Sequence, residues 1–183
     1  MTVKEEEMAR FQDRIIRAAK LDVNLYEEVE ADKGAMRQAM AVVILSSVAA
    51  GIGTITRAGI LGIVMGTVSA LVGWYVWAYV TYLIGTKLLP EPQTKADPGE
   101  LLRTIGFSSS PGLIRILGLI PGLGRLVFFV ASIWMLVAMV IAVRQALDYR
   151  STLRAIGVCV IGWVIQVVIF LLLFAIFGLS RGL

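Results

Sequence analysis

Few side chains in this sequence could do chemistry inside its apolar segments. They are an arginine, a glutamine and three consecutive serines, which form a candidate intramembrane polar site: Arg115, Gln166, Ser108, Ser109 and Ser110. A guanidinium and an amide beside a short capped helix could bind an anion, as discontinuous helices do in transporters. The structural alternatives are N-capping for the serines, which precede Pro111, an interhelical hydrogen bond for Gln166 and snorkelling for Arg115. At mid-membrane, an unpaired Arg115 would cost at least about 2.5 kcal/mol.

Enzyme chemistry is not expected. The chain has no histidine, which removes the usual general base and the usual zinc and haem ligand. Its acidic residues lie in the N-terminal segment and in loops, where burial does not tune a carboxylate for catalysis. The single cysteine, Cys159, lies within an apolar run and can form neither an intramolecular disulfide nor a metal cluster. We therefore predict a protein that is not an enzyme, with no catalytic residue, cofactor or metal.

The composition indicates an integral membrane protein. Of 183 residues, 58% are hydrophobic and 16% are charged, and the mean hydropathy is +0.83. Several apolar runs reach the roughly 18 residues that a helix needs to cross a hydrocarbon core of about 30 Å. The net charge is +4, but the basic residues form no block, so nucleic acid is not an expected partner.

The apolar runs predict an all-α polytopic membrane helix bundle. Residues 1–36 are expected to form a cytosolic amphipathic segment, and residues 37–183 a membrane domain with five transmembrane segments. The spans are expected at about residues 37–56, 58–88, 106–122, 123–146 and 155–179. The third is short, because a dozen residues at a rise of about 1.5 Å do not cross the hydrocarbon core. Local thinning or burial against other helices would make up the difference.

The N-terminal segment predicts an amphipathic helix in MARFQDRIIRAAKL, which could lie in the headgroup region or dock on a partner. Asp22 or Asn24 is a plausible N-cap for a second helix, LYEEVEADKGAMRQAM, that runs into the first span. We interpret its acidic cluster as a solvated face, with a partner-binding surface as the alternative: Glu27, Glu28, Glu30 and Asp32.

Small residues recur every three or four positions at the start of the second span, which places them on one helix face. They are Gly59, Gly62, Gly66, Ser69 and Gly73. Small residues let helix backbones approach closely in lipid, where packing drives association. We interpret this stripe as a helix-packing seam, with a pore lining as the alternative.

Basic residues predict the orientation, because cytoplasmic loops near span ends are enriched in Lys and Arg. With the N-terminus in the cytoplasm, a crossing at 106–122 places the link that contains Arg144, Arg150 and Arg154 in the cytoplasm too. If that stretch only dipped into the membrane, the link would lie outside. We therefore expect a cytoplasmic N-terminus and an external C-terminus, in the cell membrane.

The second half of the chain resembles the Yip-domain family, in a prokaryotic form. The family's motifs recur here in order, as Leu102 to Pro111, Pro121-Gly122, Ile133-Trp134 and a basic link from Arg144 to Arg154, and LDVNLYEEVEAD is similar to prokaryotic members. The resemblance implies five membrane helices with a cytosolic N-terminus and no catalytic residues. Eukaryotic members, named for interaction with Ypt and Rab GTPases, act as adaptors in vesicle formation and membrane shaping.

Together these features predict a non-enzymatic membrane scaffold or adaptor. Its expected partners are the lipid bilayer and other membrane proteins or a second copy of itself as a homo-oligomer, and no small-molecule substrate is expected. One alternative is a small transporter or pore for an anionic solute that uses Arg115 and Gln166. Another is an accessory subunit of a larger membrane complex.

Overall fold

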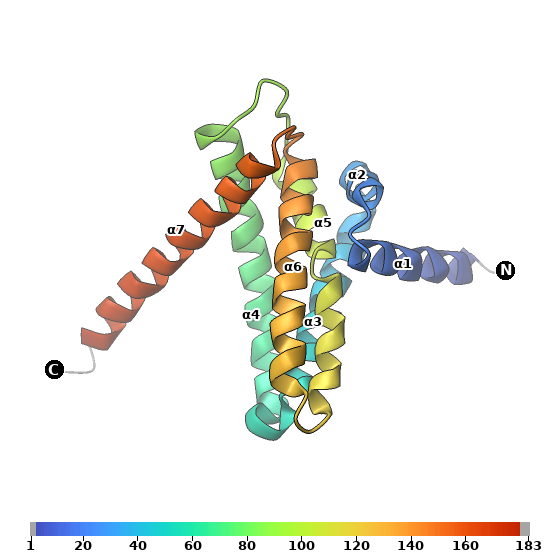
Figure 1. The fold of residues 1–183 in the computed structure, drawn as a ribbon, viewed down its shortest axis with the longest axis vertical. Coiled ribbons are helices and arrows are strands. Elements are labelled where there is room, and N and C mark those ends of the chain that lie inside the picture. Colours follow the sequence, from blue (N-terminus) through green and yellow to red (C-terminus); the bar gives the residue numbers. More distant parts are fainter. Residues whose placement is uncertain (1–2, 180–183) are drawn as a thin grey trace.

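Four long apolar helices form the frame of the molecule. The computed structural model describes residues 3–179, and these are helical with no strand among them. Helices α3 (Ala35–Gly53), α4 (Ile55–Leu83) and α6 (Gly124–Ala146) run side by side, and α7 (Thr152–Leu179) leaves them at an angle (Figure 1). Each provides a segment long and apolar enough to cross a membrane. The prediction of an all-α polytopic membrane bundle is confirmed.

The N-terminal helices lie at the side of this frame. Helix α1 (Val3–Ala19) points away from the long helices, roughly across their direction, and α2 (Val23–Ala31) lies beside its inner end (Figure 1). Of the two candidate N-caps, Asp22 and Asn24, the structure has Asp22, whose side chain accepts from the Asn24 backbone N–H at 3.0 Å. The predicted continuous helix from α2 into the membrane is wrong. Asp32 is extended (φ −83°, ψ 96°) and its carboxylate accepts from the Gly34 N–H at 2.9 Å, which ends one helix before α3 begins.

The stretch predicted to form a short third span, residues 106–122, contains the last two residues of one helix and a second helix of another type. Helix α5 (Pro98–Phe107) begins with a capping box between Asp97 and Glu100 and is followed by η2 (Ser110–Leu119), a 3₁₀-helix. A 3₁₀-helix rises about 2.0 Å per residue, so these ten residues reach about 20 Å where an α-helix would reach about 15 Å. In Figure 1 the yellow segment that contains η2 runs along α6 to the end of the bundle where α6 begins.

Side-chain capping of this segment by its serines is not observed. The N-cap residue of η2, Ser109, has helical angles (φ −79°, ψ −8°) instead of the extended ones that side-chain capping needs, and makes no such bond. Ser108 donates its hydroxyl back to the Ile105 carbonyl at 2.7 Å. Pro111 does stand in the first turn of η2, as expected.

Small residues bring α5 and η2 into close contact with α3. Gly106 faces Ala39, Gly112 faces Ser46, and Gly118 faces Gly53. Ser46 and Gly53 of α3 are seven residues apart and Gly112 and Gly118 of η2 are six apart, which are two turns of an α-helix and of a 3₁₀-helix. Two turns are about 11 Å long in the first and about 12 Å in the second, so the positions stay matched. A methyl group on Gly106 would already lie 2.7 Å from the Ala39 Cβ, so there is no room for one.

Candidate functional site: the polar end of the bundle

A buried arginine fastens α1 to the rest of the molecule. Arg14 is only 1% exposed, and its guanidinium donates to Glu28 at 2.9 Å, to Asp32 at 2.8 Å and to Gln38 at 2.7 Å. We call these residues the Arg14 cluster. Because Glu28 and Asp32 belong to the α2 segment and Gln38 to α3, one side chain joins three elements. A planar guanidinium with several fixed donors suits such a site better than a lysine.

For Glu28 and Asp32, the cluster corrects the interpretation of the acidic residues as a solvated face. Hydrogen bonding from Arg14 lowers the pKa of Asp32. Burial opposes ionisation of Glu28, but hydrogen bonds from Arg17 and Arg14 still lower its pKa. The sequence carried a signal for this pairing, since Glu28 and Asp32 are four residues apart and lie on one face of a helix, as do the arginines of α1.

Further hydrogen bonds hold α1 and α2 on the bundle. Trp134 of α6 donates its indole N–H to the Ala19 carbonyl at the end of α1, at 2.8 Å. Arg103 of α5, 5% exposed, donates to the carbonyls of Val29 (3.0 Å) and Glu30 at the end of α2. A cation at a helix C-terminus satisfies carbonyls that have no partner within the helix. The N-terminal helices are therefore packed on the membrane domain.

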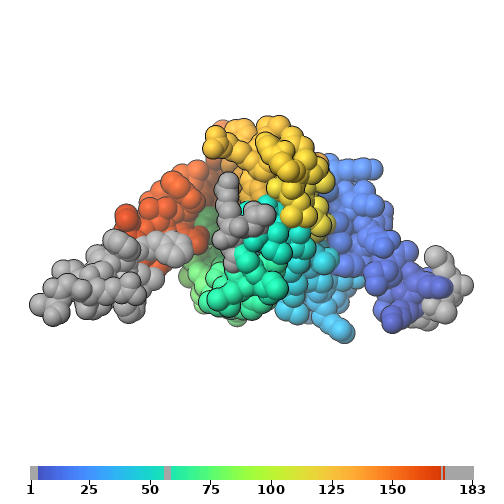
Figure 2. Space-filling view, turned by 90° about the horizontal axis from the view of Figure 1, so that it is seen from below, coloured from blue at the N-terminus to red at the C-terminus, as the bar shows by residue number. Residues whose placement is uncertain are grey.

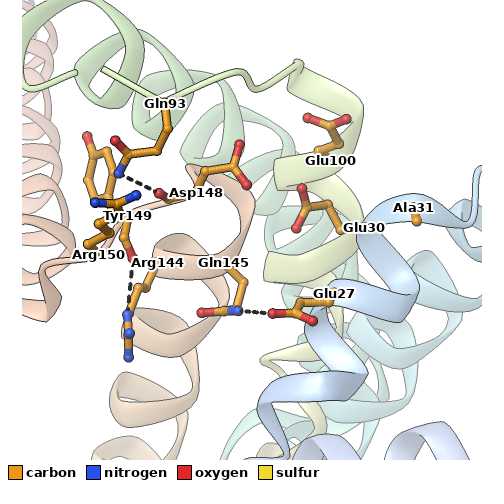
Figure 3. Close-up of a pocket in the computed structure, with 10 residues that line it drawn as sticks. All are labelled: Glu27, Glu30, Ala31, Gln93, Glu100, Arg144, Gln145, Asp148, Tyr149 and Arg150. Atoms are coloured by element: carbon orange, nitrogen blue, oxygen red, sulfur yellow. Dashed lines mark hydrogen bonds between the residues drawn. The ribbon is translucent and has the colours of Figure 1, made fainter. Parts of the chain in front are cut away.

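A polar hollow of about 760 Å³ opens between α2, α5 and the turn after α6 (Figure 3). Its lining is mainly charged and amide side chains: Glu27, Glu30, Gln93, Glu100, Arg144, Gln145, Asp148 and Arg150, with Ala31 and Tyr149. Gln145 donates to Glu27 at 2.8 Å, which closes one side. Burial, together with repulsion from Asp148 and Glu100, raises the pKa of Glu30 to about 7.

We expect Glu30→Gln to stabilise the protein at pH 8 and not at pH 4. The pKa of Glu30 is about 7 in the folded protein and 4.5 when the group is free. Between these pH values the carboxyl takes up a proton on folding, so the free energy of unfolding falls as the pH rises. The gain at pH 8 is at most about 3 kcal/mol. The measurement is the thermal unfolding midpoint in detergent at both pH values.

Asp148→Asn is the control for this prediction. It removes a repelling neighbour but keeps the titrating group, so the pH dependence should persist at a lower pH. Asparagine suits the left-handed backbone of this position (φ 52°). Equal effects of Glu30→Gln at pH 4 and pH 8 would show that Glu30 does not titrate in this range.

A buried tyrosine joins the two turns beside the hollow. Tyr149 lies 4% exposed, and its hydroxyl is 3.0 Å from the Gly85 carbonyl and 2.7 Å from the Leu89 carbonyl. Gly85 is the second residue of the π-helix η1 (Ile84–Leu88), which continues α4, and Leu89 is the residue after η1. Burial raises the pKa of Tyr149 to about 12, so it remains a donor at physiological pH.

Arg115 lies toward one end of the bundle. Its backbone carbonyl packs against Gly53, the last residue of α3, and its guanidinium lies 5.7 Å from the centre of the Phe128 ring. Its Nε atom is buried and has no hydrogen-bond partner among the described residues. Arg115 therefore lies beside the end of α3 and the first turns of α6, and not halfway along these helices. From this end of α3, snorkelling to the membrane surface is the favoured interpretation.

The other polar candidates lie in different surroundings. Ser108 and Ser110 are buried beside α6 and α3, where the Ser108 hydroxyl lies 3.9 Å from the Met139 sulfur and the Ser110 hydroxyl has no partner among the described residues. Gln166 faces a groove between α4 and α7. Arg115 contacts the last residue of α3 and the first turns of α6. The contacts given for Arg115, Gln166 and the serines therefore do not place them in one common site.

The predicted packing seam on α4 has open space beside three of its five residues. A methyl group built on Gly59, Gly66 or Gly73 would meet nothing within 4 Å among the described residues. Gly59 instead supports a kink in α4, with φ 62°. The seam therefore remains a prediction for contact with another molecule.

Several long apolar helices and a polar end rich in charged side chains define the class: a multi-pass helical membrane protein. A family model, the Yip1 domain, matches residues 26–176. The chain therefore belongs to the Yip1 domain family, and the resemblance predicted from its motifs is confirmed. The match extends from α2 into α7 and leaves α1 outside. No curated protein and no solved structure matches the chain.

Proposed function

We propose that the protein is a non-enzymatic membrane scaffold that holds a helical module, α1 and α2, flat against the cytoplasmic surface of the bilayer. The observation that carries the proposal is the docking of α1 across the direction of the spans, fixed by the buried Arg14. The basic residues of the loops favour the cytoplasm for the polar end of the bundle, where α1 and α2 are docked.

The free side of α1 suits a bilayer surface. Arg14 points to α2, while Met8 and Ile16 are 52% and 53% exposed on the other side of the helix. Exposed apolar side chains on an amphipathic helix that lies in the membrane plane enter the headgroup region. The polar hollow then faces the cytoplasm, where its carboxylates and arginines are accessible to a protein partner.

The test uses nitroxide labels on α1 in nanodiscs, in a Cys159→Ala background. We expect labels at Met8→Cys and Ile16→Cys to be more accessible to oxygen, which concentrates in lipid, than to a water-soluble nickel complex. A label at Glu6→Cys, on the polar side, should show the reverse. Equal nickel access at the three positions would show that α1 stands in water, and would contradict the proposal.

Transport has no comparable support, because Arg115, Gln166 and the serines are not joined in one site. We expect no anion flux from proteoliposomes that contain the purified protein. A flux that is lost in Arg115→Ala would favour the transporter over the scaffold.

A further inference from the structure

The divergence of α7 leaves an apolar groove on the membrane-embedded side of the protein. The groove has a volume of about 460 Å³ and lies between α4 and α7. In Figure 2 the coloured part of α7, orange to red, lies on one side of the molecule. We call it the lateral groove, and its lining includes Ser69, Gly73 and Trp77 of α4 and Gly162, Gln166 and Ile169 of α7.

One group in the lateral groove does not suit lipid. The Gln166 side chain carries two N–H donors and a carbonyl acceptor, and it forms no hydrogen bond within the described part of the chain. An unsatisfied polar group in hydrocarbon costs several kcal/mol. An acyl chain could fill the apolar volume, but it offers neither a donor nor an acceptor. The occupant of the groove must therefore bring a polar group to the depth of Gln166.

We propose that the lateral groove receives α7 of a second copy of this chain, with the two Gln166 amides hydrogen-bonded to each other. Two copies inserted in the same orientation are related by a twofold axis along the membrane normal, which places identical residues at identical depth. An amide is self-complementary, because the carbonyl of one copy accepts from the N–H of the other. The proposal rests on the proposed function, since it names the scaffold's own copy as its partner.

The surfaces around Gln166 fit this arrangement. On α7, large apolar side chains next to the groove are uncovered in one copy, as with Ile169 at 45% exposure and Trp163 at 64%. On α4, Ser69 and Gly73 leave space for an approaching helix, since a methyl group on Gly73 would meet nothing within 4 Å. Reciprocal docking covers both faces at once, so neither copy keeps an open groove.

Disulfide crosslinking in liposomes tests the contact, again in the Cys159→Ala background. Ile169 lines the groove and its neighbour Val168 does not, although they are 45% and 47% exposed and lie at nearly the same depth. Under copper-phenanthroline oxidation at low protein density, we expect Ile169→Cys to form at least about fivefold more dimer than Val168→Cys. Equal yields would indicate random collisions and overturn the proposal.

Subunit counting by single-molecule photobleaching tests the role of the amide. Gln166→Leu should raise the protein density at half-dimerisation by about tenfold, because interhelical side-chain hydrogen bonds in membranes have about this effect. Val168→Leu should leave it unchanged. Two results would overturn the proposal. One is a protein that stays monomeric at all densities and retains bound phospholipid. The other is a crosslink from Ile169→Cys to a different membrane protein. Unchanged nitroxide accessibility of α1 in Gln166→Leu would separate such a failure from failure of the proposed function.

Discussion

Arg14→Met is expected to undock α1 from the bundle and to cost about 3 kcal/mol of docking free energy. Methionine fills a similar volume but leaves Glu28, Asp32 and Gln38 without their common donor. Arg17 still donates to Glu28 at 2.6 Å, but the nearest contact of Arg10 with Asp32 is 3.7 Å, so Asp32 loses its close cation. The measurement is hydrogen exchange of the α1 and α2 amides in detergent, where exchange should accelerate by about a hundredfold.

Arg10→Met provides the matched control. It removes the same charge, one helical turn away, from the same pair of carboxylates. Arg10 is 61% exposed on its side chain, so its ion pairs are screened by water and salt and contribute well under about 1 kcal/mol. Hydrogen exchange in α2 should therefore hardly change. If both variants accelerated exchange equally, net charge and not the buried hydrogen bonds of Arg14 would hold α1 in place.

Acid should release α1 by the same mechanism. The pKa values of Glu28 and Asp32 are lowered in the folded protein, so their contribution to stability is present above the unfolded values and is lost as the pH falls through the folded ones. Glu30 acts in the opposite sense, because its raised pKa costs stability toward pH 7. Docking of the N-terminal helices is therefore expected to be tightest in mildly acidic solution.

The long helices were predictable from the sequence because the requirement for crossing a membrane is local. A run of apolar residues of sufficient length is enough, so the predicted ranges around α3, α4, α6 and α7 agree with the structure to within a few residues. The form of the segment from Ser110 to Leu119 was not predictable in this way. Its 3₁₀ geometry is favoured by contact with α3, a neighbour that lies far away in the sequence.

The Arg14 cluster shows where the prediction of the site stopped. Helical periodicity correctly put Arg14 on the polar side of an amphipathic helix. Its burial depends on the turn at Lys20 and Leu21, where a left-handed residue (Leu21, φ 62°) folds α2 back onto α1. Periodicity within one helix gives no information about such a turn, so it did not predict the burial of Arg14.

The small residues that make the close contact within the chain lie outside the predicted stripe. The stripe on α4 has helical spacing, and it was expected to pack against a neighbour. The intramolecular contact of η2 instead uses Gly112 and Gly118, which are six residues apart, a period of two 3₁₀ turns. This spacing was visible in the sequence, but it indicates a shared face only if the segment is a 3₁₀-helix.

Gly53→Ala is expected to destabilise the membrane domain by about 2 kcal/mol. The new methyl group would overlap the backbone carbonyl of Arg115 and lie 3.2 Å from the Phe128 ring, and a backbone atom cannot move aside as a flexible side chain can. Alanine is intrinsically the better helix former by up to about 1 kcal/mol, so a net loss would show that close packing outweighs propensity. The measurement is unfolding in mixed micelles by titration with SDS.

Gly66→Ala is the matched control, because it makes the same change in the next membrane helix where a methyl group meets nothing within 4 Å. Only the helix propensity acts there, so the monomer should be unchanged or slightly more stable. A comparable loss in both variants would mean that any added methyl group is harmful. A loss for Gly53→Ala alone assigns the close packing of this fold to the contact of α3 with η2, and leaves the small residues of α4 for contacts between molecules.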